Sequence, residues 1–138
     1  MAGLLVAVVA IAALVFEQSI FAVGPIAIVV QILAALLMIW ARITFGTRSF
    51  HAAANPTEGG LVTTGPYRYF RHPIYAAIMY FVCAAVASHL SWIHVLLGLA
   101  VIAGLFVRIL AEEQLIVKQY PEYASYAAKT KRIVPFIF

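Results

Sequence analysis

The chain has 138 residues, of which 65% are hydrophobic and 10% are charged, and its lysines and arginines outnumber its acidic residues to give a net charge of +4. The length corresponds to one domain, and so few charged residues could not cover that much apolar surface in water. The composition therefore excludes an ordinary soluble protein and predicts a single integral membrane domain over residues 1–138. Because the positive charge is placed as membrane topology requires, we expect membrane lipids and no nucleic acid as partners.

Four apolar segments predict an all-α fold, an integral membrane four-helix bundle. The predicted spans cover about residues 3–23, 26–43, 73–87 and 92–111. Gly24-Pro25 separates the first two spans, because glycine and proline end one helix and proline can open the next. Residues 44–64 form a polar loop punctuated by glycine and proline. The C-terminal tail, 112–138, mixes charged, tyrosine and aliphatic residues and predicts an interfacial helix up to about Lys129.

The distribution of lysine and arginine predicts the orientation in the membrane. All nine fall in the middle loop or near and beyond the end of the fourth span, and the other two connections contain none. Positive residues accumulate on the cytoplasmic side, so the middle loop and both termini are predicted to be cytoplasmic. An even number of spans also places both termini and the middle loop on the same side of the membrane. We predict a multi-pass protein of a bacterial or archaeal inner membrane.

One polar cluster lies at the end of the fourth predicted span. Arg108 and Glu112 are four residues apart and share a helix face, and Glu113 is surrounded by apolar residues at helical spacing. Adjacent carboxylates in such surroundings have to be paired, hydrated or bound to a ligand. The structural alternative is a simple ion pair where the helix leaves the bilayer.

A second polar cluster opens the third predicted span. Pro73 suits the first turn of a helix, so Arg71 and His72 precede it at an end where free N–H groups and the helix dipole attract anions. Arg68 adds a further positive charge, although snorkelling arginines and interfacial tyrosines would be a structural alternative. The two clusters together suit a ligand with an anionic carboxylate and cationic groups, the latter placed near the two glutamates.

The two clusters and the tail form an ordered set of motifs. The set comprises Gly65-Pro66-Tyr67, Arg71-His72-Pro73-Ile74-Tyr75, Arg108-x3-Glu112-Glu113-x-Leu115, Tyr120-Pro121-x-Tyr123-x2-Tyr126 and Arg132-x2-Pro135. Over about residues 60–135 the order and spacing of these motifs resemble the isoprenylcysteine carboxyl methyltransferase family and its phospholipid N-methyltransferase relatives.

The resemblance implies a helical membrane enzyme that uses S-adenosylmethionine without a Rossmann domain. The chain indeed lacks a predicted strand followed by a glycine-rich turn. By this resemblance Arg108 and Glu112 lie near the transferred methyl group and are the predicted catalytic residues. The predicted cofactor-binding residues are Tyr67, Arg68, Arg71, His72, Pro73, Tyr75, Glu112, Glu113, Tyr123, Tyr126 and Arg132. The tail is expected either to cover the cofactor as a lid or to lie on anionic headgroups.

The methyl acceptor stays open at this point. The predicted function is methyl transfer at the cytoplasmic membrane face to a lipophilic or lipid substrate that offers a carboxylate, an amine or a thiol. Two alternatives fit part of the sequence. A sterol-reductase-like, NADPH-dependent membrane reductase shares the Arg-His-Pro run and the tail, and a non-enzymatic membrane subunit would use its polar ends only as anchors. The adjacent glutamates favour the methyltransferase.

No pair of potential ligands has metal-site spacing, so we expect no metal, and the oligomeric state is open.

Overall fold

The computed structural model describes residues 2–46 and 60–134. The elements are α1 (Ala2–Phe16), α2 (Pro25–Phe45), the 3₁₀ helix η2 (Gly65–Arg68), α3 (Pro73–Ser88), α4 (Trp92–Gln119) and α5 (Tyr123–Lys129). Within the described ranges there is no strand, only an isolated bridge, so the all-α prediction is confirmed for them. Most of the predicted middle loop lies outside the described residues.

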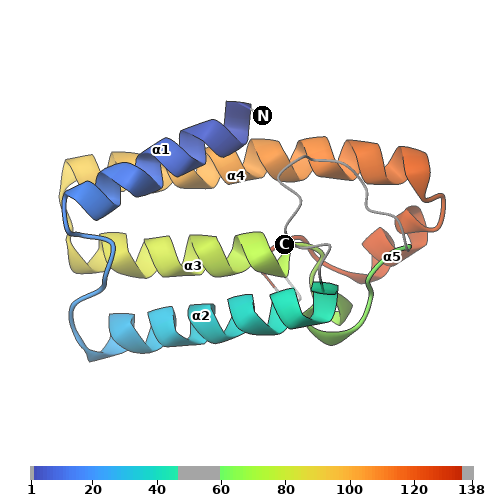
Figure 1. Cartoon of the computed structure of the whole chain (residues 1–138), viewed down its shortest axis with the longest axis horizontal. Helices are drawn as coiled ribbons and strands as arrows, with labels where there is room; N and C mark the ends of the chain where they lie inside the picture. Colours follow the sequence, from blue (N-terminus) through green and yellow to red (C-terminus); the bar gives the residue numbers. More distant parts are fainter. Residues whose placement is uncertain (1, 47–59, 135–138) are drawn as a thin grey trace.

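The four long helices lie side by side (Figure 1). Helix α1 packs on α4, α4 contacts α3, and α3 packs on α2. At the α1–α4 contact a Cβ atom on Gly104 would lie 2.5 Å from the carbonyl oxygen of Gly3. Ala7 and Ala10 of α1 are buried in the same contact region. Small residues let two backbones approach closely, which is how helices commonly pack in a membrane.

The helices differ in how far they could reach across a bilayer. Helices α2 and α4, with 21 and 28 residues, are long and apolar enough to span one. Helices α1 and α3 have 15 and 16 residues. At 1.5 Å per residue each covers only about 23 Å of a hydrocarbon core that is about 30 Å thick. Among the described residues, two helices therefore have the length of a full span, where the sequence predicts four spans.

The first predicted span, about 3–23, has to be corrected, because α1 ends at Phe16. The residues that follow form a loop whose backbone is bound by Gln31 of α2. The Gln31 amide nitrogen donates to the carbonyl of Ile20 (2.9 Å), and its amide oxygen accepts from the N–H of Ala22 (2.8 Å). Since a buried side chain satisfies these backbone groups, an apolar segment can leave the helix without losing hydrogen bonds.

The fourth helix and the tail also need correction. Helix α4 continues past the predicted end at Ala111 as far as Gln119. Glu112 and Glu113 therefore lie within α4, and the tail is not one interfacial helix. The chain leaves the helix next to Pro121, which cannot continue the backbone hydrogen bonds, and α5 follows as a separate short helix.

The segment 130–134, here called the tail strap, returns from α5 to α3. The N–H of His72 donates to the carbonyl of Arg132 (3.0 Å). Further along α3, the Tyr80 hydroxyl donates to the carbonyl of Ile133 (2.8 Å), and the Ile133 side chain is buried. The strap thereby brings the end of the described chain onto the beginning of α3.

Candidate functional site

The approach to α3 is shaped by a glycine and a proline. Gly65 opens η2 with φ of +56°, and a Cβ atom there would lie 2.5 Å from Oγ1 of Thr44 in α2. Both the backbone conformation and the available space therefore require glycine. Pro73 occupies the first turn of α3, where its missing N–H costs no helical hydrogen bond. The buried His72 directly precedes it, at the N-cap position.

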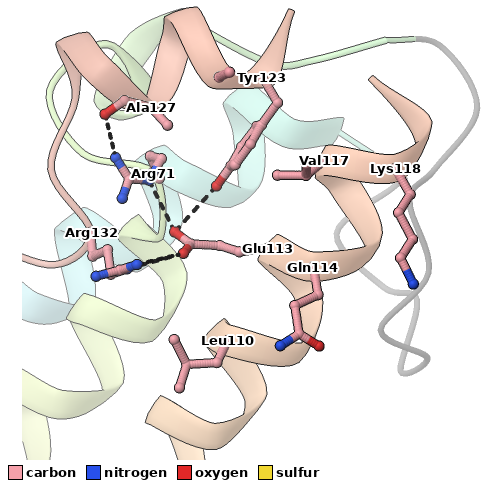
Figure 2. Close-up of a pocket in the computed structure, with 10 residues that line it drawn as sticks. Arg71, Leu110, Glu113, Gln114, Val117, Lys118, Tyr123, Ala127 and Arg132 are labelled. Atoms are coloured by element: carbon pink, nitrogen blue, oxygen red, sulfur yellow. Dashed lines mark hydrogen bonds and ion pairs between the residues drawn. The ribbon is translucent and has the colours of Figure 1, made fainter. Parts of the chain in front are cut away.

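The carboxylate of Glu113 on α4 is the centre of a polar network. Its Oε1 atom accepts hydrogen bonds from Arg71 Nε (3.0 Å), His72 Nε2 (3.2 Å) and the Tyr123 hydroxyl (3.2 Å). Its Oε2 atom accepts from Nε and Nη2 of Arg132, both at 3.0 Å. Figure 2 shows Arg71, Tyr123 and Arg132 pointing at Glu113 from separate parts of the chain. The two polar clusters predicted from the sequence thus meet at one place.

Burial makes this network costly to disturb. The side chains of Glu113 and Arg71 are only 12% and 9% exposed. Arg71 also donates through Nη1 to the carbonyls of Ala127 (2.8 Å) and Thr130 (2.6 Å), so it connects α5 and the tail strap to α3. Removing the carboxylate would leave this guanidinium charge buried without its counter-charge, and breaking a buried pair in this way costs about 3–5 kcal/mol.

Tyr75, Arg108 and Glu112 form a second polar set beside the first. Arg108 Nε donates to Glu112 Oε1 (2.8 Å) and to the Tyr75 hydroxyl (3.2 Å), and this hydroxyl donates to the same Glu112 oxygen. The two hydrogen bonds to Glu112 therefore both use its Oε1 atom, and among the described residues no side chain donates to its Oε2 atom. The rings of Tyr75 and His72 lie 5.8 Å apart, so the two sets are adjacent. Arg108 is buried, whereas Glu112 keeps 19% of its side chain exposed.

Two tyrosines near the network, Tyr123 and Tyr126, act as hydrogen-bond donors. The Tyr126 hydroxyl donates to the carbonyl of Tyr67 (2.6 Å), and the buried Tyr67 ring packs against Phe45 with centroids 5.4 Å apart. Burial raises the pKa of Tyr67 and of Tyr123 above the usual range, and it raises the pKa of Tyr126 to about 12. All three phenols are therefore protonated near neutral pH. Arg68, by contrast, is exposed.

An open cavity of about 540 Å³ lies next to the Glu113 network (Figure 2). Its lining consists of Arg71, Leu110, Glu113, Gln114, Val117, Lys118, Tyr123, Ala124, Ala127 and Arg132. A volume of this order can hold a small molecule or the head of a larger one. The lining combines the charged network with apolar side chains from α4.

A model of the phospholipid methyltransferase family matches residues 19–123 of the chain. The chain belongs to this family. The match covers more than half of the chain and includes every predicted site residue except Tyr126 and Arg132. Neither a curated protein nor a solved structure matches it. The resemblance derived from the sequence motifs is confirmed at the level of the family, and family membership together with two long apolar helices indicates an association with membranes.

Most of the predicted site residues of this phospholipid methyltransferase family member come together in the structure. The two polar sets join Arg71, His72, Tyr75, Arg108, Glu112, Glu113, Tyr123 and Arg132. Pro73 contributes by starting α3, and Tyr67 contributes through its carbonyl. Within the described part of the chain, no hydrogen bond or ion pair joins the exposed Arg68 to either set. The sequence motifs do not include Gln114 and Lys118, which also line the cavity. Their helical spacing from Leu110 is the signal that could have found them.

Proposed function

We propose that this protein transfers a methyl group from S-adenosylmethionine to a lipophilic acceptor at the membrane face where α3 begins and α4 ends. The observation that carries the proposal is the junction of Arg71 and His72 with the adjacent glutamates of α4, in a chain of the phospholipid methyltransferase family. The family supports methyl transfer to lipid-type substrates. The opposite charges gathered at the junction support a ligand that itself carries both charges.

The side chains at the junction fit the chemistry of such a cofactor. S-adenosylmethionine supplies, when bound, an activated methyl group on a sulfonium sulfur. Arg71 and His72 are suited to hold its carboxylate, and Glu112 Oε2 is suited to accept from its ribose hydroxyls or ammonium group. Glu113 is already surrounded by protein donors. We therefore assign Glu113 to holding the shape of the site and Glu112 to contacting the ligand.

Arg108 and Glu112 are the residues we assign to the acceptor. An amine or thiol acceptor has to lose a proton, which Glu112 can take at Oε2. A carboxylate acceptor has no proton to lose, and Arg108 can orient it by charge. Tyr75 and Arg108 both bind Oε1 of Glu112. They therefore hold the carboxylate in one orientation, which is the positioning that methyl transfer requires.

The tail strap and α5 are proposed to cover the site. Tyr123 and Arg132 bind Glu113, and Tyr126 binds the carbonyl of Tyr67, so the cover is attached through side chains of the site itself. A cover of this kind excludes water, which would otherwise solvate the acceptor and weaken electrostatic interactions within the site. Opening of the strap would admit the cofactor.

We infer that all four long helices enter the bilayer and that the site faces the cytoplasm. The α1–α2 and α3–α4 connections carry no lysine or arginine, and they lie at the opposite end of the helices from the site (Figure 1). The positive charges near the site favour the cytoplasmic side for it. The shorter α1 and α3 could be accommodated by local thinning of the bilayer.

Calorimetry of the detergent-purified protein with S-adenosylmethionine and with its demethylated product tests the proposal. We expect saturable binding that Glu112→Gln weakens about tenfold or more, because a charge-assisted hydrogen bond is lost. Glu17→Gln, in the exposed loop after α1, is the matched control and should bind normally. Binding of NADPH without binding of S-adenosylmethionine would instead support a reductase. Unchanged binding of S-adenosylmethionine in both His72→Ala and Glu113→Ala would contradict the site proposed for the cofactor.

A further inference from the structure

The end of the molecule opposite the site consists of two connections, 17–24 between α1 and α2 and 89–91 between α3 and α4 (Figure 1). The surface of this end is apolar. Its exposed large apolar side chains include Phe16, Phe21, Val23, Ile26, Leu90 and Trp92. Leu90 and Trp92 are 76% and 73% exposed. So many apolar side chains at one end need an apolar partner, because contact with water is unfavourable for them.

The backbone of the longer connection is bonded to the protein itself. Gln31 binds one N–H and one carbonyl of this connection. His89 Nε2 donates to the carbonyl of Phe21 (2.8 Å), and the N–H of Ser19 donates to the carbonyl of Leu14 (3.0 Å). Acyl chains offer no hydrogen bonds, so an irregular segment can lie at membrane depth only where the protein supplies its partners. The connection is therefore suited to surroundings without water.

The length of α4 places this end relative to the bilayer. Arg108 is the first lysine, arginine, aspartate or glutamate of α4. A charged side chain is costly deep in the bilayer, so Arg108 marks the boundary of the hydrocarbon core on the side of the site. The helix rises about 24 Å between Trp92 and Arg108, whereas the core is about 30 Å thick. The far end of α4 therefore lies at or below the opposite boundary of the core.

Glu17 limits how deeply the two connections can lie. It is the one charged side chain in their sequences, and it is exposed at the end of α1. A carboxylate is costly in the bilayer unless water or lipid headgroups can reach it. The connections therefore belong near the edge of the core and not near its middle.

We propose that both connections lie among the acyl chains at the edge of the hydrocarbon core, in the leaflet opposite the site. The partner of this apolar end is then the acyl region of that leaflet. The inference rests on the entry of all four long helices into the bilayer but not on the methyl-transfer reaction. Local thinning of the bilayer, the other way to accommodate short helices, would instead bring headgroups and water to Leu90.

Spin labelling of the whole protein in dioleoylphosphatidylcholine vesicles tests this placement. A nitroxide is attached at Leu90→Cys or at Val23→Cys, in each case together with Cys83→Ser, which removes the native thiol. Its relaxation is measured with oxygen, which concentrates among acyl chains, and with a water-soluble nickel chelate on both sides of the membrane. We expect the ratio of oxygen to nickel relaxation at both positions to be several-fold higher than at Lys129→Cys, an exposed position of α5.

Trp92 gives a second measurement that leaves this end unmodified. In Trp40→Phe it is the remaining tryptophan of the chain. Its fluorescence should be quenched strongly by phosphatidylcholine that carries bromine on its acyl chains and only weakly by iodide in the water.

A ratio at Leu90 or Val23 as low as at Lys129, or strong iodide quenching of Trp92, would overturn the placement. A label at Val9→Cys, on an exposed position midway along α1, separates this failure from a wider one. If Val9 is in lipid while Leu90 is in water, the helices enter the bilayer and only the immersed end is refuted. If Val9 is also in water, the entry of α1 into the bilayer is refuted as well. Binding of S-adenosylmethionine, measured by calorimetry, tests the methyltransferase proposal independently of both results.

Discussion

Helix α4 is held by two different kinds of contact along its length. Around Gly104 it meets α1 backbone to backbone, whereas around Glu113 it meets α3, α5 and the tail strap through charged hydrogen bonds. Lipid solvates apolar side chains about as well as a neighbouring helix does, so the first contact depends on close packing. Buried charges have no such substitute and must be paired. The stability of the α1–α4 contact should therefore depend on the size of the side chains in it, and the stability of the Glu113 network should depend on its charges.

The largest effect is expected from removing the central charge. Glu113→Ala should destabilise the fold by about 3–5 kcal/mol, because it leaves Arg71 buried without a counter-charge. The strap loses its anchor at Arg132, so backbone amide exchange should accelerate at Arg71 and His72, whose N–H groups bind the strap. Hydrogen exchange followed by mass spectrometry measures this directly.

Glu17→Gln is the control for this variant, because Glu17 is exposed and lies in the loop after α1. Exchange at the start of α3 that is as slow in Glu113→Ala as in the control would contradict the role assigned to the carboxylate.

The packing of α1 on α4 is tested by adding one methyl group. In Gly104→Ala the new Cβ would lie 2.5 Å from the Gly3 carbonyl oxygen and 3.0 Å from the Ala7 nitrogen, both backbone atoms. We expect a destabilisation of about 1–3 kcal/mol by overpacking, measured by thermal unfolding in detergent. In Gly98→Ala the Cβ would meet only the Val86 side chain, at 2.9 Å. That variant should be clearly less destabilised, and equal losses in the two variants would count against a tight backbone contact.

A single hydrogen bond of the strap should have a smaller effect. Tyr80→Phe removes the donor to the Ile133 carbonyl while keeping the ring. The expected loss is about 0.5–1.5 kcal/mol, seen as faster exchange of the strap amides with little change in the rest of the molecule. Tyr69→Phe, at an exposed tyrosine, serves as the control. Equal amide exchange of the tail strap in Tyr80→Phe and Tyr69→Phe would show that this hydrogen bond does not hold the strap on α3.

The last effect is confined to alkaline pH. Because burial raises the pKa of Tyr126 to about 12 in the folded protein, while a free phenol has a pKa of about 10, folding favours the protonated form. The stabilisation is complete below about pH 10 and is lost as the pH rises to about 12. Tyr126→Phe should therefore lose less stability than wild type across this interval, as measured by unfolding at each pH. Parallel stability curves would contradict the assignment.

Proline and glycine positions made much of the fold predictable. Pro25 and Pro73 begin helices as expected, and the prediction of an all-α chain holds for the described residues. The end of α1 was not predictable, because the loop after it depends on Gln31, which is distant in sequence and supplies the missing backbone partners. The end of α4 was misplaced because polarity rises at Glu112, while the helix ends only near Pro121.

The site could be predicted as a meeting of two clusters but not in its internal pairing. The spacing of Arg108 and Glu112 on one helix face predicts their contact, which the structure contains. No local pattern indicates that the protein itself would occupy both oxygens of Glu113, because its partners come from α3, α5 and the strap. Lys118 shares a helix face with Leu110, but no local pattern indicates that this face lines a cavity, because α5 residues form part of the lining.

A crystal structure of the protein with S-adenosylhomocysteine, grown in a lipid phase, tests the central claim most directly. The account predicts that the ligand lies between the start of α3 and the end of α4, with its carboxylate on Arg71 or His72 and a polar group on Glu112. A ligand bound away from these three residues, with the Arg71 and Glu112 side chains turned from it, would contradict the account.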